Sequence, residues 1–120
     1  MKILLVFLGG GMGSLARFYV STLTENFTSA FPYGTLISNI TASLILGIVA
    51  GYLLGVQNNS LRFLIIVGFC GGFSTFSSFS FETFELLRTA QMGQALLNIF
   101  INTVLCLLAI LCGLFLGKNL

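Results

Sequence analysis

The feature that most constrains this chain is the length of its uncharged stretches. Residues 26–61, 63–81 and 89–117 contain no Asp, Glu, Lys or Arg, and residues 3–24 contain only Arg17. Uncharged apolar runs longer than about 18 residues are typical of transmembrane helices. Four spans are therefore predicted, at about 3–23, 33–56, 61–88 and 93–117. They form a single domain over residues 1–120, with a polar loop over 24–32.

The composition supports an all-α membrane protein. Hydrophobic residues make up 57% of the chain and charged residues 7%, whereas soluble domains carry about 25% charged residues. A transmembrane β-barrel needs strands of about 10 residues with alternating polarity, and these runs are too long and too uniformly apolar. The net charge of +2 comes from scattered residues, which argues against nucleic acid as a partner.

Neither the N-terminal apolar run nor the three cysteines indicates a special function. Lys2 before an apolar run that ends near Ala16 is compatible with a secretory signal peptide, but no clear cleavage site follows and more membrane-type sequence does. Cys70, Cys106 and Cys112 lie inside predicted spans without CxxC spacing or any histidine. They are expected to be packed thiols and not a metal site.

Glycines recur at helical spacing in the first two predicted spans. Gly9 and Gly13 form one GxxxG pair, and Gly47, Gly51 and Gly55 continue the same spacing. Small residues at this spacing let helices approach closely in lipid, within one chain or between chains. The first glycine run also resembles a phosphate-binding loop, but no strand precedes it and no Gly-Lys-Ser/Thr follows.

The stretch 68–82, Gly-Phe-Cys-Gly-Gly-Phe-Ser-Thr-Phe-Ser-Ser-Phe-Ser-Phe-Glu, is the most informative part of the sequence. Paired glycines weaken a helix by about 1 kcal/mol each, and hydroxyl residues alternate with Phe76 and Phe79 after them. One interpretation is a helix broken within the membrane, whose freed carbonyls bind a cation. The other is a continuous helix whose hydroxyls bond their own i−4 carbonyls while the phenyl rings face lipid.

Isolated polar residues in the other spans also allow two interpretations. Arg17 either extends to the membrane surface or lines a cationic vestibule that attracts anions. Asn39, and the pair Asn98 and Asn102 on one face of the fourth span, either donate to an anion or hold helices together. Glu82 is expected near the membrane surface as a solvated charge.

The chain has no His or Asp, and no serine has a visible base, so enzymatic activity is not expected.

Three motifs in order resemble those of the Fluc/CrcB fluoride channels, and the resemblance covers nearly the whole chain. They are Gly-Gly-Gly-Met-Gly-Ser-Leu-Ala-Arg at 9–17, Gly-Thr-Leu-Ile-Ser-Asn at 34–39, and the stretch 68–82. The resemblance implies an antiparallel, dual-topology homodimer of four-helix subunits in the inner or plasma membrane. Such a dimer exports fluoride passively through two pores at its interface and so relieves fluoride toxicity. Some relatives pair as heterodimers of two paralogues.

The matching motifs also imply roles for individual residues. The implied fluoride pathway comprises Asn39, Phe76, Phe79, Ser77, Ser78, Ser80 and the vestibule residue Arg17. The backbone carbonyls of Gly71 and Ser74 are implied to hold a structural sodium ion on the two-fold axis. The sequence departs from the family pattern at Ser74, Ser43, Cys106 and Ile110, the last two standing where hydroxyl residues are expected in helix four.

Two other classes of membrane protein compete with this interpretation. A small multidrug-type exporter couples transport to protons through an intramembrane carboxylate, but the first predicted span has none and Glu82 comes late in the third. A non-transporting or holin-like assembly explains the apolar helices but not the alternation of hydroxyl and phenyl groups in 68–82. The sequence therefore favours a fluoride channel over a multidrug exporter.

Overall fold

The computed structural model describes residues 1–27 and 31–120, and within these ranges every regular element is helical. Four helical segments are long and apolar enough to cross a membrane, as predicted. The segments are α1 (Lys2–Thr24), α2 (Tyr33–Leu53), a composite third segment over Asn59–Arg88, and α6 (Met92–Lys118). Residues 28–30 of the expected 24–32 loop lie outside the described part.

The third segment consists of four pieces. They are α3 (Asn59–Leu61), the wide π-helical turns η1 (Arg62–Cys70), α4 (Gly71–Phe73) and α5 (Phe76–Arg88). The Asn58 side chain caps the start of this segment by accepting a hydrogen bond from Leu61 N–H at 3.0 Å. The preceding helix α2 ends at Leu53, three residues before the predicted boundary.

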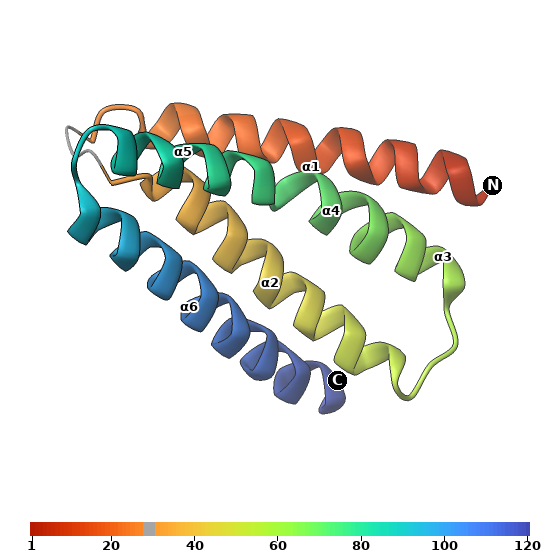
Figure 1. Ribbon diagram of the computed structural model, residues 1–120. Helices are drawn as coiled ribbons and strands as arrows, with labels where there is room; N and C mark the ends of the chain where they lie inside the picture. Colours follow the sequence, from red (N-terminus) through yellow and green to blue (C-terminus); the bar gives the residue numbers. More distant parts are fainter. Residues whose placement is uncertain (28–30) are drawn as a thin grey trace.

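The helices are arranged as two packed pairs (Figure 1). Helix α1 lies along η1 and α4, while α2 lies along α6. Both termini and the 54–58 link are at one end of the bundle, and the 89–91 link is at the other. The four membrane-length segments differ in length, with 21 residues in α2, 23 in α1, 27 in α6 and 30 in the composite third segment, and α6 is inclined to α1 in this view.

Glycines form both helix crossings, as the GxxxG spacing predicted. Gly9 and Gly13 of α1 face the backbone of η1 and α4, and in return Gly68 faces Gly9 while Gly72 faces the backbone of Gly10. A Cβ atom on Gly47 would lie 2.5 Å from the Ile110 carbonyl oxygen across the α2–α6 crossing. Such contacts are possible only without side chains, so glycine sets the close approach. Gly55 lies past the end of α2 and takes no part in a crossing.

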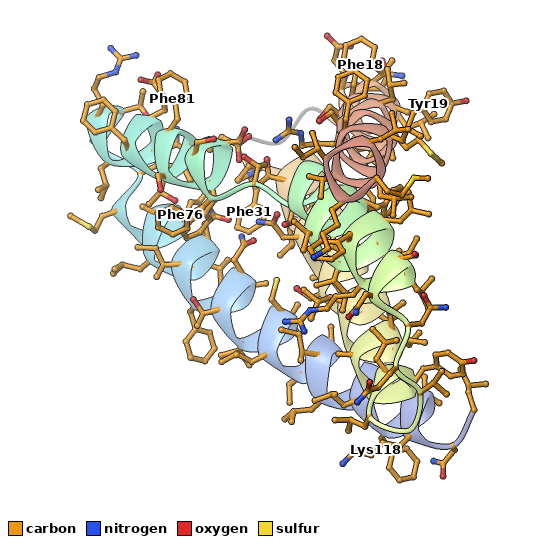
Figure 2. All side chains as sticks on the ribbon, turned by 90° about the vertical axis from the view of Figure 1, so that its right-hand side faces the viewer. Phe18, Tyr19, Phe31, Phe76, Phe81 and Lys118 are labelled. Atoms are coloured by element: carbon orange, nitrogen blue, oxygen red, sulfur yellow. The ribbon has the colours of Figure 1, made fainter. Side chains whose placement is uncertain are left out.

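The single chain has little interior. Its buried cluster consists of Ala42, Cys70 and Phe73, whereas many large apolar side chains are exposed. Phe18, Tyr19 and Phe81 point outward (Figure 2). A soluble domain of this size buries most of its apolar side chains, so this surface is suited to lipid or to another protein chain.

Candidate functional site

The third segment changes direction at Ser74 and Thr75. Both residues are extended, with φ −78° and ψ 155° at Ser74 and φ −151° and ψ 119° at Thr75. Thr75 then caps α5, because its hydroxyl oxygen accepts a hydrogen bond from Ser78 N–H at 3.2 Å. Figure 2 shows α5 diverging from α1 after this point, whereas η1 and α4 follow α1 closely.

Asn39 of α2 holds the backbone at this interruption. Its Oδ1 accepts a hydrogen bond from Thr75 N–H at 2.8 Å, and its Nδ2 donates to the Thr75 carbonyl at 3.4 Å. The same Nδ2 donates to Oδ1 of Asn102 on α6 at 3.2 Å. One half-buried amide therefore ties together α2, α6 and the residue that precedes α5.

The hydrogen bonds at the interruption leave two carbonyls without their helical donors. In a continuous α-helix the Gly71 carbonyl would accept from Thr75 N–H, and the Ser74 carbonyl from Ser78 N–H. Here Thr75 N–H donates to Asn39, and Ser78 N–H donates to the Thr75 hydroxyl. A hard cation prefers such oxygen ligands, so the carbonyls of Gly71 and Ser74 are compatible with the cation site that the family resemblance implies.

The alternative hydrogen-bond pattern, in which hydroxyls bond their own helix, is also present. Ser74 Oγ donates to the Cys70 carbonyl at 2.7 Å, and Thr83 Oγ1 donates to the Phe79 carbonyl at 2.8 Å. Neither bond spans the interruption between α4 and α5. The i−4 hydrogen bonds of the second interpretation therefore occur beside the interruption, whereas the continuous helix that it required does not form.

A cavity of about 280 Å³ lies beside Asn39 and the start of α5. Its lining residues come from α2, α5, α6 and the interruption: Asn39, Ser43, Ser74, Thr75, Phe76, Phe79, Asn102, Thr103 and Cys106. The Phe76 and Phe79 rings have centroids 5.7 Å apart and are tilted by 44°. The structure thus brings together the asparagine and both phenylalanines singled out in the sequence.

The other residues of the implied fluoride pathway lie outside this cavity. Ser77 and Ser78 place their hydroxyl oxygens 3.1 and 3.4 Å from the Thr75 hydroxyl oxygen. Ser80 is exposed on α5, and Arg17 is half-buried on α1. Ile110 contributes its backbone to the α2–α6 crossing, whereas Cys106 lines the cavity.

Sequence reasoning missed Thr75 and Thr103 as members of this site. Thr75 follows the paired glycines and precedes a helix, which is the position where threonine is favoured as an N-cap. Thr103 is adjacent to Asn102, which shares one face of the fourth span with Asn98. Ser43 and Cys106 follow Asn39 and Asn102 by four residues, so each shares a helix face with a site residue. The four-residue spacing from the asparagines is therefore the signal that identifies Ser43 and Cys106.

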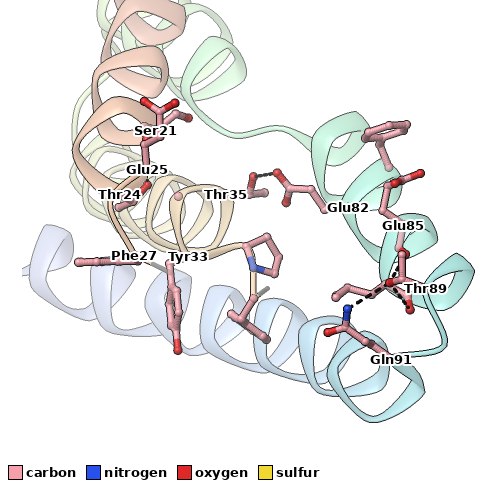
Figure 3. Close-up of a pocket in the computed structure, with 15 residues that line it drawn as sticks. Ser21, Thr24, Glu25, Phe27, Tyr33, Thr35, Glu82, Glu85, Thr89 and Gln91 are labelled. Carbon is pink, nitrogen blue, oxygen red and sulfur yellow. Dashed lines mark hydrogen bonds between the residues drawn. The ribbon is translucent and has the colours of Figure 1, made fainter. Parts of the chain in front are cut away.

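A second cavity, of about 460 Å³, opens between the end of α1, the start of α2 and α5 (Figure 3). All three acidic residues of the chain, Glu25, Glu82 and Glu85, line it. Glu82 is half-buried and accepts a hydrogen bond from the Thr35 hydroxyl at 2.8 Å, so it is not the solvated charge that was expected. Glu85 instead forms an exposed ion pair with Arg88.

Comparison with known proteins gives a consistent family relationship. Residues 4–114 match the family described as CrcB-like protein, Camphor Resistance (CrcB). A "Fluoride-specific ion channel FluC" of Coxiella burnetii is 41% identical, with all of both chains covered. Its Pyrococcus furiosus namesake is 42% identical, covering 98% of this chain and 97% of the relative, and that of Francisella tularensis is 36% identical, covering 94% and 92%. The chain therefore belongs to the CrcB-like family.

Proposed function

We propose that this chain is the subunit of a fluoride-selective channel that lets fluoride leave the cell passively across the inner or plasma membrane. The observation that carries the proposal is the convergence of Asn39, Phe76 and Phe79 on one cavity beside the α4–α5 interruption. The names of the relatives at 36–42% identity support the same ion. Its role is transport and not catalysis.

The chemistry of this cavity suits a small, strongly hydrated anion. A selective pathway has to replace the water around fluoride with hydrogen-bond donors, while holding the ion weakly enough for release. Asn39 is the central donor, and its 3.4 Å bond to the Thr75 carbonyl is the longest of its contacts and the one an arriving anion would replace. The hydroxyls of Ser77, Ser78 and Ser80 extend the pathway along α5.

The phenyl rings supply a second kind of contact. An aromatic ring carries partial positive charge at its edge, so Phe76 and Phe79 can meet fluoride edge-on without trapping it. Phe76 is 79% exposed in the single chain, which leaves its ring accessible from outside the subunit. Arg17 is proposed to raise the local anion concentration at the entrance.

The active form is proposed to be an antiparallel dimer with the α4–α5 interruption near the middle of the membrane. Gly71 supports this arrangement, because no atom from outside its own helical turn lies within 4 Å of the position its Cβ would occupy. Two subunits would then offer four carbonyl oxygens, from Gly71 and Ser74 of each, to one sodium ion. A pair of identical chains is the simplest dimer, and a paralogue in the opposite orientation is the alternative partner.

The proposal is tested with purified protein in liposomes loaded with potassium fluoride or potassium chloride. Efflux is started with a potassium ionophore and followed with ion-selective electrodes, with protein-free liposomes as the control. Fluoride is expected to leave rapidly and chloride at the rate of the control. Equal release of both anions would contradict the proposal, and uptake of an organic cation driven by a pH gradient would favour the multidrug exporter.

A further inference from the structure

A chain of hydrogen bonds joins the cavity to buried residues outside it. Thr75 N–H donates to Asn39 Oδ1 at 2.8 Å, and Asn39 Nδ2 donates to Asn102 Oδ1 at 3.2 Å. Asn102 Nδ2 then donates to Asn98 Oδ1 at 2.7 Å, and Asn98 Nδ2 donates to Thr83 Oγ1 at 2.9 Å. The chain ends where the Thr83 hydroxyl donates to the Phe79 carbonyl at 2.8 Å. Every donor points the same way along the chain. Bonds aligned in this manner polarise and strengthen one another.

The middle of this chain is fully enclosed. Asn98 is 0% exposed, and Asn102 and Thr83 are 5% and 7% exposed. An amide buried so completely is costly unless its donor and acceptor are both satisfied, so its orientation is fixed by its neighbours. Neither Asn98 nor Thr83 lines the 280 Å³ cavity, and any effect they have on an ion there passes through other residues.

The orientation of each amide follows from the hydroxyl at the end. A threonine hydroxyl has one hydrogen, and Thr83 uses it for the Phe79 carbonyl. Asn98 must therefore turn its NH₂ group toward Thr83 and its Oδ1 toward Asn102. Asn102 in turn presents Oδ1 to Asn39, which places the Asn39 NH₂ group at the cavity and its Oδ1 on Thr75.

We infer that Asn98 is a positioning residue for the ion pathway: through Asn102 it sets the direction of the Asn39 amide, and through Thr83 it holds the Phe79 backbone. This inference rests on the proposed function. Asn98 links two residues that meet the cavity, one on α2 and one on α5, without contacting the cavity itself. Its removal is therefore expected to impair conduction while the subunit remains folded.

The flux experiment compares variants that differ only in the hydrogen bond. Thr83→Val keeps the shape of threonine but removes the hydroxyl, and Thr83→Ser keeps the hydroxyl. Thr83→Val and Asn98→Leu are each expected to lower fluoride efflux by about fivefold, the factor that corresponds to one typical net hydrogen bond. Thr83→Ser is expected to stay close to wild type, and the double variant Thr83→Val with Asn98→Leu to be no slower than Asn98→Leu alone.

A second readout separates positioning from loss of stability. Ala95→Gly removes a buried methyl group from the same helix, one turn before Asn98, and weakens α6 without touching the hydrogen-bond chain. The NMR shift of the Thr75 amide proton reports its bond to Asn39. That shift is expected to move in Asn98→Leu and Thr83→Val, and to stay at the wild-type value in Ala95→Gly and Thr83→Ser.

The outcomes distinguish this inference from the proposed function. Wild-type protein that carries no fluoride would overturn both. Wild-type conduction with equal efflux and an unchanged Thr75 shift in Thr83→Val and Thr83→Ser would overturn the positioning role of Asn98 alone. If Asn98→Leu does not fold, the matched pair at Thr83 gives the same decision.

Discussion

Asn39 is the residue at which the polar contacts of three elements meet. It accepts from and donates to Thr75, and it donates to Asn102. Because both the oxygen and the NH₂ group of this amide are hydrogen-bonded, the side chain is already oriented before an ion arrives. At the scale of single residues, the site is therefore a preorganised amide that lines one cavity together with two phenyl rings.

The phenyl rings give the first prediction. Replacing Phe76 or Phe79 by isoleucine fills similar space but removes the positive ring edge, so fluoride efflux is expected to fall by roughly tenfold, in line with about 1.4 kcal/mol of lost ring interaction. Phe76 is mostly exposed in the subunit, so the fold should tolerate its change. Efflux from liposomes measures the effect.

Phe115→Ile is the matched control for these variants. Phe115 is 70% exposed on α6 and does not line the 280 Å³ cavity. Its replacement is expected to leave efflux unchanged. Wild-type rates in both cavity variants would remove the phenyl rings from the pathway.

The sequence identified some residues of this site better than others. Asn39, Phe76 and Phe79 were predicted because they stand in a recognisable motif, and they do line one cavity. The contact between Asn39 and Asn102 joins residues 63 positions apart, and no local pattern specifies such a pairing. The half-buried state of Glu82 was missed because it depends on Thr35 from another helix.

At the scale of elements, glycine decides how closely the helices pack. The spacing of Gly47 and Gly51 predicted a close crossing, and both face the backbone of α6. The sequence did not show which helix would be the partner, because GxxxG spacing is the same for contacts within and between chains. The π-helical turns of η1 were also unexpected, since nothing in Arg62–Cys70 distinguishes wide turns from ordinary ones.

The α2–α6 crossing gives the second prediction. A Cβ atom on Gly113 would lie 2.5 Å from the Leu44 carbonyl oxygen, so Gly113→Ala is expected to destabilise the protein by about 1–3 kcal/mol through overpacking. Gly93→Ala has open space around it and is expected to be neutral or stabilising by up to about 1 kcal/mol. Thermal unfolding in detergent compares the two, and equal effects would contradict the assigned crossing.

The turn between α5 and α6 gives the third prediction. Ala90 has a φ of 59°, a left-handed conformation that glycine adopts more readily, and Gln91 N–H closes the turn on the Leu86 carbonyl at 2.8 Å. Ala90→Gly is therefore expected to raise the free energy of unfolding by roughly 0.5–1 kcal/mol. Ala95→Gly, inside α6, is expected to lower it by about 1 kcal/mol. A loss of stability in both would show that the turn is not strained.

At the scale of the whole molecule, positive charge is nearly balanced between the two ends of the bundle. Lys2, Arg62 and Lys118 lie toward the end that carries the termini, and Arg17 and Arg88 toward the other. Orientation in the membrane follows the excess of Lys and Arg in short loops. A difference of one charge is a weak signal, which suits a chain that inserts both ways.

Dual insertion is the fourth prediction. A cysteine placed at Gln57, in a background without Cys70, Cys106 and Cys112, is expected to react with a membrane-impermeant reagent from both sides of native membranes. Gln57 lies in the exposed link between α2 and α3, so the reagent can reach it. Reaction from one side only would exclude the antiparallel homodimer and indicate an oppositely oriented paralogue.

The unequal helix lengths described above suggest that the protein responds to the thickness of the surrounding bilayer. At 1.5 Å per residue, the 27 residues of α6 extend about 40 Å, whereas the 21 residues of α2 extend about 32 Å. The hydrocarbon layer is about 30 Å thick, so α6 is accommodated by tilting or by extending its ends into the headgroup layers. Because α6 carries Asn102, which accepts a hydrogen bond from Asn39, a change in the tilt of α6 is expected to alter that bond. The acyl-chain length of the surrounding lipids is thus expected to tune the rate of ion passage, with the bilayer acting as an adjustable part of the channel.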